Sequence, residues 1–327
     1  MNAFLLLIYH AVLNGTPLLF GTTGEILTEK SGNLNLGVEG MMFMGGALGL
    51  GGAFYYEQAF GENANGVVAV LLALLCAFMG GAAGATIYAF LTVTLRANQN
   101  VTGLALSIFG TGAGQFIGEY MRVRSGGYVA IGNRLKSFFM SAPMPPALQN
   151  IPVLGILLFR YHVFVYIGVA VAIAMSFYLN GTRSGLHLRA VGESPSAADA
   201  AGIPVTRYKY AATILGGGIS AVGGMTYIMT IAGCVWNHDG LSGEGWLAVA
   251  LVIFCLWRPL RAIWGSILFG ALMILYLRLQ LSFVPDQIYK ILPYVVTALV
   301  LTVTSAHNRR DTQPPASLGL PWFREER

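Results

Sequence analysis

Long uncharged apolar runs alternate with short polar stretches along the whole chain. Four of the runs, 63–95, 97–118, 161–182 and 210–238, carry no charged residue. Each is longer than the roughly 20 residues that a helix needs to cross the bilayer core. Because lipid offers backbone groups no hydrogen-bond partner, such segments fold as helices. The alternating segments of about 10 residues that are typical of barrel strands are absent. The pattern predicts an all-α, polytopic helical membrane protein.

The apolar runs and their charged boundaries predict about nine membrane segments. They lie near 3–22, 37–56, 66–95, 101–119, 161–180, 208–232, 246–257, 261–281 and 288–306. The first lacks the positive start and small-residue cleavage site of a signal peptide, so we retain it as a helix. The seventh is short, between Glu244 and the pair Arg258-Pro259. Short segments in transporters often line the pathway. A frayed helix, or a hairpin that stops short of full depth, explains the length equally well.

Lysine and arginine residues predict the orientation of these segments. With the N-terminus outside, twelve of the 19 basic residues fall on the inner side and seven on the outer side. Cytoplasmic loops of membrane proteins carry the excess of positive charge. The polar segment 183–207 is therefore expected in the cytoplasm, and the long loop 120–160 outside.

Composition excludes several other classes of protein. Only 10% of the residues are charged and the mean hydropathy is +0.65, whereas soluble domains have about 25% charged residues. The net charge of +5 is spread over many loops, so we expect no nucleic-acid site. Three distant cysteines and five scattered histidines predict no metal site and no cofactor. The sequence has no G-x-x-x-x-G-K-[ST] phosphate loop and no catalytic constellation, so ATP hydrolysis by this chain is not expected.

Two groups of polar residues lie within apolar segments. Asn33, Asn35 and Glu39 stand at the start of the second segment, and an i, i+4 spacing predicts that Asn35 and Glu39 share a helix face. Because an ionisable group is costly in lipid, Glu39 is expected to face the bundle interior. The cluster either ties the helix end to neighbouring backbone or lines a polar solute path.

A second polar stripe follows the fourth segment. Ser107, Thr111 and Gln115 recur at i, i+4 spacing on an otherwise apolar helix. The stripe predicts either hydrogen bonds between helices or a border of the central pathway or permease–permease interface.

A short capped helix is predicted within the cytoplasmic segment 183–207. Ser194 is suited to the N-cap and Pro195 to the first turn. Gly202 is suited to the C-terminal cap, and Pro204 prevents the helix from resuming. The helix from Pro195 to Ala201 has a nearly smooth surface of small residues. It is either a contact for a groove on another protein or an ordered connecting loop.

Several motifs resemble those of one transporter family. The stretch GLHLRAVGESPSAADAAGIPV is similar to the coupling segment of permeases from binding-protein-dependent ABC importers for branched-chain amino acids, simple sugars and nucleosides. The family pattern R-A-x-G-x-x-x-x-A-A-x-x-x-G is matched by Arg189, Ala190, Gly192, Ala197, Ala198 and Gly202. EKSGNLNLGVEGMM, NQNVTGLALSIFGTG and GWLAVALVIFCLWRPLRAIWGSILFG resemble the same family, and IPVLG resembles its nucleoside branch.

The resemblance implies a fold, partners and a substrate class. It implies a type II ABC importer-like permease bundle of about eight to ten helices in the bacterial inner membrane, occupying residues 1–306. The partners implied are an ATP-binding subunit, a second permease (a heterodimer first, a homodimer second) and an extracytoplasmic solute-binding protein. ATPase coupling is expected at Arg189, Ala190, Gly192, Glu193, Ala197, Ala198, Ala201 and Gly202.

The same resemblance leaves two alternatives for the transported solute and the energy source. A nucleoside or related purine or pyrimidine is the first expectation for the solute, and a simple sugar is the second. A self-sufficient secondary transporter or channel is the competing class of protein. The tail, residues 307–327, carries no family motif and is expected to be a disordered cytoplasmic end.

Overall fold

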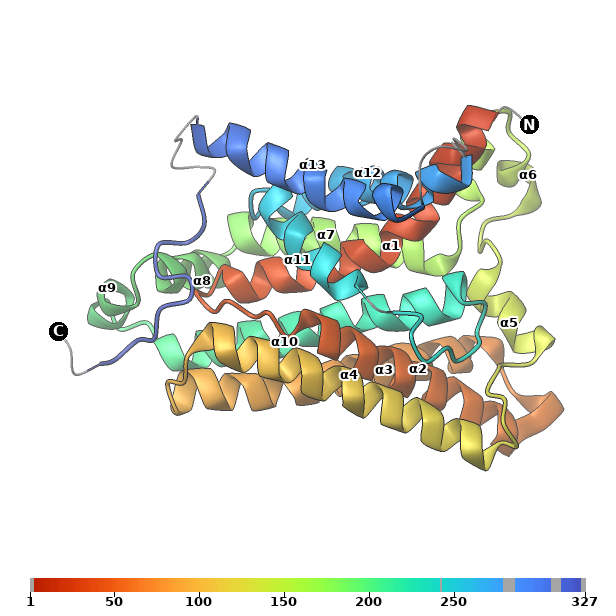
Figure 1. The fold of residues 1–327 in the computed structure, drawn as a ribbon, viewed down its shortest axis with the longest axis horizontal. Helices are drawn as coiled ribbons and strands as arrows, with labels where there is room; N and C mark the ends of the chain where they lie inside the picture. Colours follow the sequence, from red (N-terminus) through yellow and green to blue (C-terminus); the bar gives the residue numbers. More distant parts are fainter. Residues whose placement is uncertain (1–2, 242, 279–285, 307–312, 325–327) are drawn as a thin grey trace.

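A computed structural model describes residues 3–241, 243–278, 286–306 and 313–324 (Figure 1). Over these residues the regular structure consists of helices joined by turns and loops, with one isolated β-bridge between Ala130 and Val235. The helices are α1 (Ala3–Glu29), α2 (Val38–Phe60), α3 (Gly66–Ala89), α4 (Gln99–Arg124), α5 (Asn133–Met140), α6 (Pro146–Gln149), α7 (Val163–Gly181), α8 (Arg183–Glu193), α9 (Pro195–Ala200), α10 (Val205–Thr226), α11 (Glu244–Phe254), α12 (Pro259–Arg278) and α13 (Asp286–Ala306).

Each of the nine predicted membrane segments corresponds to one of these helices. Five of the described helices are long and apolar enough to cross a bilayer, namely α1, α3, α4, α7 and α10. In α3 and α10 the span includes the π-helical turn that follows the helix. The chain is therefore a multi-pass helical membrane protein. Helix α11 is the short predicted segment. Its 11 residues extend roughly 16 Å, about half of the bilayer core.

Helices α2 and α10 form the centre of the bundle. Helix α2 packs against α3, α4 and α10, and α10 also packs against α1 and α3. Small residues permit these close approaches: a Cβ atom at Gly224 in α10 would lie 1.9 Å from the carbonyl oxygen of Met42 in α2. Such small faces are typical of membrane helices, whose association depends on packing and not on exclusion of water. Helices α12 and α13 lie across α1 and α11 from α2 and α4 (Figure 1).

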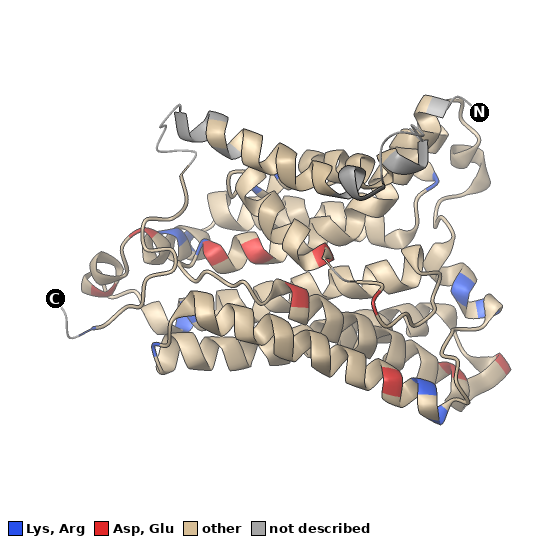
Figure 2. Ribbon diagram, viewed as in Figure 1, with Lys and Arg blue, Asp and Glu red and all other residues tan. Residues whose placement is uncertain are grey.

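The bundle has two different ends, which we call the α9 end and the α5 end. Helices α8 and α9 and the described tail lie at one end, while α5, α6 and the N-terminus lie at the other (Figure 1). Lysine and arginine gather at both ends, whereas several acidic residues lie within the bundle (Figure 2). The basic residues predict that α8 and α9 lie on the cytoplasmic face of the membrane and α5 on the other face, and this sidedness stays a prediction.

The tail differs from its expected disorder. Residues 313–324 run along the α9 end and make defined contacts there, whereas 307–312 and 325–327 lie outside the described residues. Leu318 packs against the core cluster that includes Leu27 and Leu188, and Trp322 packs against the cluster formed by Val191, Ala198 and Val205. The apolar side chains in LGLPWF, within an otherwise polar tail, supply the area that holds it in place.

Candidate transport pathway and coupling segment

Helix α9 forms at the predicted place, one residue shorter than expected. The Ser194 hydroxyl accepts a hydrogen bond from the Ala197 N–H at 3.4 Å, and Pro195 occupies the first turn. Ala201 is the C-cap, and Gly202 follows with φ of +80°, the left-handed conformation that glycine adopts most easily. These signals are local in sequence, which is why the helix could be predicted.

The residues expected to couple to an ATPase divide into buried and exposed positions. Ala198 is buried between Val191 and Val205, and so it belongs to the packing of α9 on its own chain. Gly192 is also buried, whereas Arg189 and Ala190 are half-buried. The outward surface is formed by Glu193, Ser196, Ala197, Ala200, Ala201 and Gly202. Any partner that contacts α9 meets Ala197, Ala200 and Ala201, and does not meet Ala198.

The tail is bonded directly to this coupling segment. The Ser317 N–H and Oγ donate to the Gly192 carbonyl at 3.0 and 2.6 Å. Arg324 Nε donates to the Asp199 carboxylate at 3.3 Å. The Phe323 ring lies beneath the guanidinium of Arg96, from the turn before α4, at 4.7 Å. Residues 313–324, which we call the tail strap, therefore connect α8 and α9 to the α3–α4 turn.

Glu39 lies at the junction of α2 and α11, in the interior of the bundle as predicted. Its carboxylate accepts three backbone N–H groups from the beginning of α11: Gly243 at 2.7 Å, Gly245 at 2.6 Å and Trp246 at 3.3 Å. The first N–H groups of a helix have no partner inside the helix, and that end carries partial positive charge. Helix α2 thus supplies the cap of the half-length helix α11.

The residues around Glu39 are close-packed and acidic. A Cβ atom at Gly245 would lie 2.4 Å from the Cα of Glu39, so only glycine permits this approach. Glu244 is also buried, and its Oε2 atom has no hydrogen-bond partner among the described residues. Tyr294 of α13 lies nearby, with its hydroxyl 3.8 Å from the position of a Cβ atom at Gly243. The break before α11 therefore holds two acidic groups within the membrane.

Asn33 and Asn35 do not continue the face of Glu39. Both precede α2, which begins at Val38, and so the predicted shared helix face of Asn35 and Glu39 is wrong. The Asn35 N–H donates to Glu25 Oε1 of α1 at 3.1 Å, and Asn33 contacts Lys209 and Thr213 of α10. These hydrogen bonds tie the α1–α2 turn to α1 and α10, and a role of either asparagine in the solute path stays a prediction.

The polar stripe of α4 changes character along its length. Ser107 is buried and donates to the Leu36 carbonyl at 2.6 Å. Thr111 and Gln115 are half-buried, and Gln115 Nε2 donates to the His238 carbonyl at 3.3 Å. Ser107 thus joins α4 to the start of α2, whereas the other two residues lie along an accessible strip.

The stripe of α4 continues beyond the residues that its spacing was used to predict. Glu119 follows Gln115 at the same spacing and accepts hydrogen bonds from Trp236 at 3.3 Å and Arg122 at 2.6 Å. Glu119, Arg122, Ala232, Val235, Trp236, Asn237 and His238 line a cavity of about 660 Å³. The repeated spacing was the signal that could have identified Glu119. The loop residues could not be found that way, because the fold alone brings them to α4.

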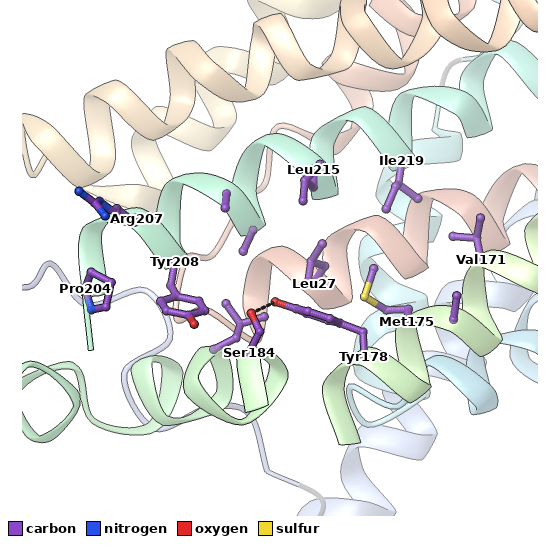
Figure 3. A pocket seen from close by; sticks show the side chains of 14 residues that line it. Leu27, Val171, Met175, Tyr178, Ser184, Pro204, Arg207, Tyr208, Leu215 and Ile219 are labelled. Atoms are coloured by element: carbon purple, nitrogen blue, oxygen red, sulfur yellow. Dashed lines mark hydrogen bonds between the residues drawn. The ribbon is translucent and has the colours of Figure 1, made fainter. Parts of the chain in front are cut away.

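A groove of about 550 Å³ between α1, α7, α8 and α10 has a different lining. Leu27, Met175, Leu215 and Ile219 point into it, and polar groups enter only near Arg207, Tyr208 and the Tyr178–Ser184 hydroxyl pair (Figure 3). An apolar groove is unsuited to a solute rich in hydrogen-bonding groups. The polar strip on α4 is the better candidate for a solute path.

Comparisons with known proteins match nearly the whole chain. Residues 7–301 match the family described as branched-chain amino acid transport system, permease component. The guanosine ABC transporter permease protein NupQ of Bacillus subtilis is 31% identical, over 95% of this chain and 94% of the relative. The nucleoside ABC transporter permease protein NupC of Lactococcus lactis is 30% identical, over 93% of each. A putative glucose ABC transporter permease protein of Haloferax volcanii is 34% identical, over 84% of this chain and 78% of the relative.

Proposed function

Because the chain belongs to the family of branched-chain amino acid transport system permease components, we propose that it is the membrane-spanning subunit of an ATP-driven importer that carries a nucleoside or a related purine or pyrimidine. The observation that carries the substrate class is the end-to-end match to two permeases named for guanosine and nucleosides. Glucose is the second candidate, since the relative named for glucose has the higher identity over a smaller share of both chains.

In this proposal the solute passes along the accessible strip of α4 and the start of α11. Thr111 and Gln115 offer hydroxyl and amide groups, and the adjoining cavity at Glu119 opens at the α5 end. Discontinuous helices in transporters commonly mark the site where solute is held. Glu39 supports the proposed path by holding the end of α11 in place.

The proposed partners meet the chain at opposite ends. An ATP-binding subunit, which hydrolyses ATP in place of this chain, contacts the exposed surface of α9. A solute-binding protein delivers solute at the α5 end. A second permease completes the path, and a heterodimer is our first choice. ATP binding favours one arrangement of the bundle only through a difference in contact energy between the two states, which the α9 contact supplies.

The test is transport by the reconstituted complex. The permease, its partner permease, the ATPase subunit and the solute-binding protein are placed in proteoliposomes, with ATP on the side of the ATPase subunit. We expect ATP-dependent uptake of radiolabelled guanosine and little uptake of glucose. Uptake of glucose alone would support the second candidate. Uptake driven by an ion gradient without the ATPase subunit would show that the chain is a secondary transporter.

A further inference from the structure

A basic cavity lies at the α9 end, apart from the proposed solute path. It has a volume of about 700 Å³ and lies between the ends of α1 and α7, helix α8, the α11–α12 turn and the tail strap. Lys30, Arg189, Arg258 and Arg261 bring four positive charges to its lining, against one carboxylate, Glu193. The lining residues as a whole come from four separate parts of the sequence, and so no local motif indicates the cavity.

The positive charges exceed the acidic charge that the described part of the chain brings to the cavity. None of the four basic side chains makes an ion pair or a side-chain hydrogen bond with a described residue. Glu193 already accepts a hydrogen bond from the Ala316 N–H at 3.3 Å. Like charges gathered around one space repel each other unless an anion lies between them.

Two of the basic groups are partly withdrawn from water, since Lys30 and Arg189 are half-buried. The Nε atom of Arg189 is fully buried without a hydrogen-bond partner among the described residues. Buried donors in folded proteins nearly always have a partner. Burial lowers the pKa of Lys30, and Arg189 and Arg258 lower it further, while Glu193 and, more weakly, Glu29 counteract the shift. An anion in the cavity would bond Arg189 and stabilise the charge on Lys30.

The cavity lies where the cytoplasmic headgroups of the bilayer are expected. Asn180 at the end of α7 and Leu260 at the start of α12 border it, and both are exposed. One turn beyond Leu260, the Trp264 side chain is also exposed, at 76%. Tryptophan is enriched at the membrane–water interface. A basic pocket between helices at this level is typical of sites for acidic lipid headgroups.

We propose that this cavity binds a phosphate group, carried by an anionic phospholipid of the inner leaflet. Guanidinium groups match phosphate geometry and bond it through two parallel N–H groups. Arg258 and Arg261 stand at the exposed mouth of the cavity, and Lys30 and Arg189 at its inner side. The bound headgroup would contact α8 and the tail strap, and so the lipid would stabilise the segment next to α9.

The experiment measures lipid retention by the purified full-length permease, with no transport step. Native mass spectrometry after exchange into micelles with phosphatidylglycerol or phosphatidylcholine gives the bound lipid. We expect retention of phosphatidylglycerol, and about 30-fold weaker retention in the double variant Arg258→Gln/Arg261→Gln, from about 1 kcal/mol for each charge. Arg207→Gln, an exposed arginine at the same end but outside this cavity, is the matched control and should retain lipid normally.

Further measurements identify the source of the phosphate and show which results would overturn the proposal. Displacement of the lipid by millimolar inorganic phosphate would show that the site takes phosphate from solution as well. Equal retention of both lipids, or unchanged retention in the double variant, overturns the proposal. Weaker binding of the ATPase subunit with unchanged lipid retention also overturns it, and assigns the charges to an acidic protein surface. Because transport is not measured, failure here leaves the proposed function intact.

Discussion

At the scale of single residues, Glu39 holds the start of α11 beside the proposed solute path. Its carboxylate accepts three backbone hydrogen bonds at the start of α11, in place of the carbonyl groups that a preceding helical turn would supply. No other described side chain caps that end, because the N-cap residue is Gly243, which has none.

We expect Glu39→Gln to lower the free energy of unfolding by about 1–3 kcal/mol. The amide presents an NH₂ group to backbone donors that now bond an oxygen, which leaves at least one buried donor without a partner. Unfolding in mixed micelles measures the change, and solute uptake should fall with it. Glu62→Gln, at an exposed position after α2, is the control and should leave stability unchanged. If Glu39→Gln unfolds like the native protein, the capping role assigned to Glu39 is wrong.

The sequence was sufficient to predict a residue's position where the free-energy cost of placing a charged group in lipid decides it. A carboxylate does not face lipid, so the inward position of Glu39 could be predicted. Its partners could not, because Gly243 and Gly245 are some 200 residues away in the chain. Asn35 was misplaced for a local reason: the break before α2 removes the helical spacing on which the prediction rested.

At the scale of elements, α9 shows which face of a short helix is free for a partner. The sequence predicts the helix and its caps, but it does not distinguish the alanines on one face from those on the other. The tail strap and α10 cover one side, with Trp322 and Val205 close to Ala198. These contacts join segments that are far apart in sequence, so the periodicity of a short helix could not reveal them.

We expect tryptophan substitutions on the two faces of α9 to have different effects. Ala198→Trp overpacks the permease's own core and should cost about 1–3 kcal/mol of its stability. Ala197→Trp adds the same ring to the exposed face, so the permease should insert and unfold normally while losing roughly tenfold or more in association with the ATPase subunit. Co-purification and solute-stimulated ATPase activity measure the loss. Full stimulation of Ala197→Trp would indicate that α9 is only a connector.

The tail strap makes a second prediction at this scale. Trp322→Ala removes a large, half-buried side chain that packs against Val191, Ala198 and Val205, and it should cost about 0.5–3 kcal/mol of stability. We expect backbone amides of 191–202 to exchange faster with deuterium, because the strap no longer holds α8 and α9. Leu320→Ala changes an exposed strap residue and should leave exchange unaltered. If exchange of these amides is unchanged in both variants, the tail strap does not stabilise α9.

At the scale of the whole molecule, the proposed ATPase contact and the proposed solute entry lie at opposite ends of the bundle, and the polar strip of α4 lies between them. The α9 end carries the proposed ATPase contact, and the α5 end carries the cavity at Glu119. Apolar run lengths were sufficient to predict the membrane class and the helices, since both depend on the surrounding solvent. The sidedness that the basic residues indicate stays a prediction. The tail contacts and the cap of α11 depend on tertiary packing, and the sequence pattern does not encode them locally.

The stripe of α4 tests whether this arrangement conducts solute. Cysteine is introduced at Ser107, Thr111 or Gln115 after the three native cysteines are replaced by alanine. We expect a water-soluble thiol reagent to modify Thr111→Cys and Gln115→Cys at rates that differ between the nucleotide-free complex and the complex trapped with ATP and vanadate. These two positions are half-buried on the proposed path, so movement of the bundle changes their access to water.

Ser107→Cys is the internal control on the same helix. Its position is buried against the Leu36 carbonyl, so reaction requires local opening, and each 1.4 kcal/mol of opening free energy slows the reaction by about tenfold. We therefore expect Ser107→Cys to react slowly in both states. If Thr111→Cys and Gln115→Cys are equally slow and insensitive to nucleotide, the stripe serves only to pack helices, and the solute path must follow another face of the bundle. Rapid reaction at all three positions would instead show that α4 separates from α2 during transport, since only that separation exposes Ser107.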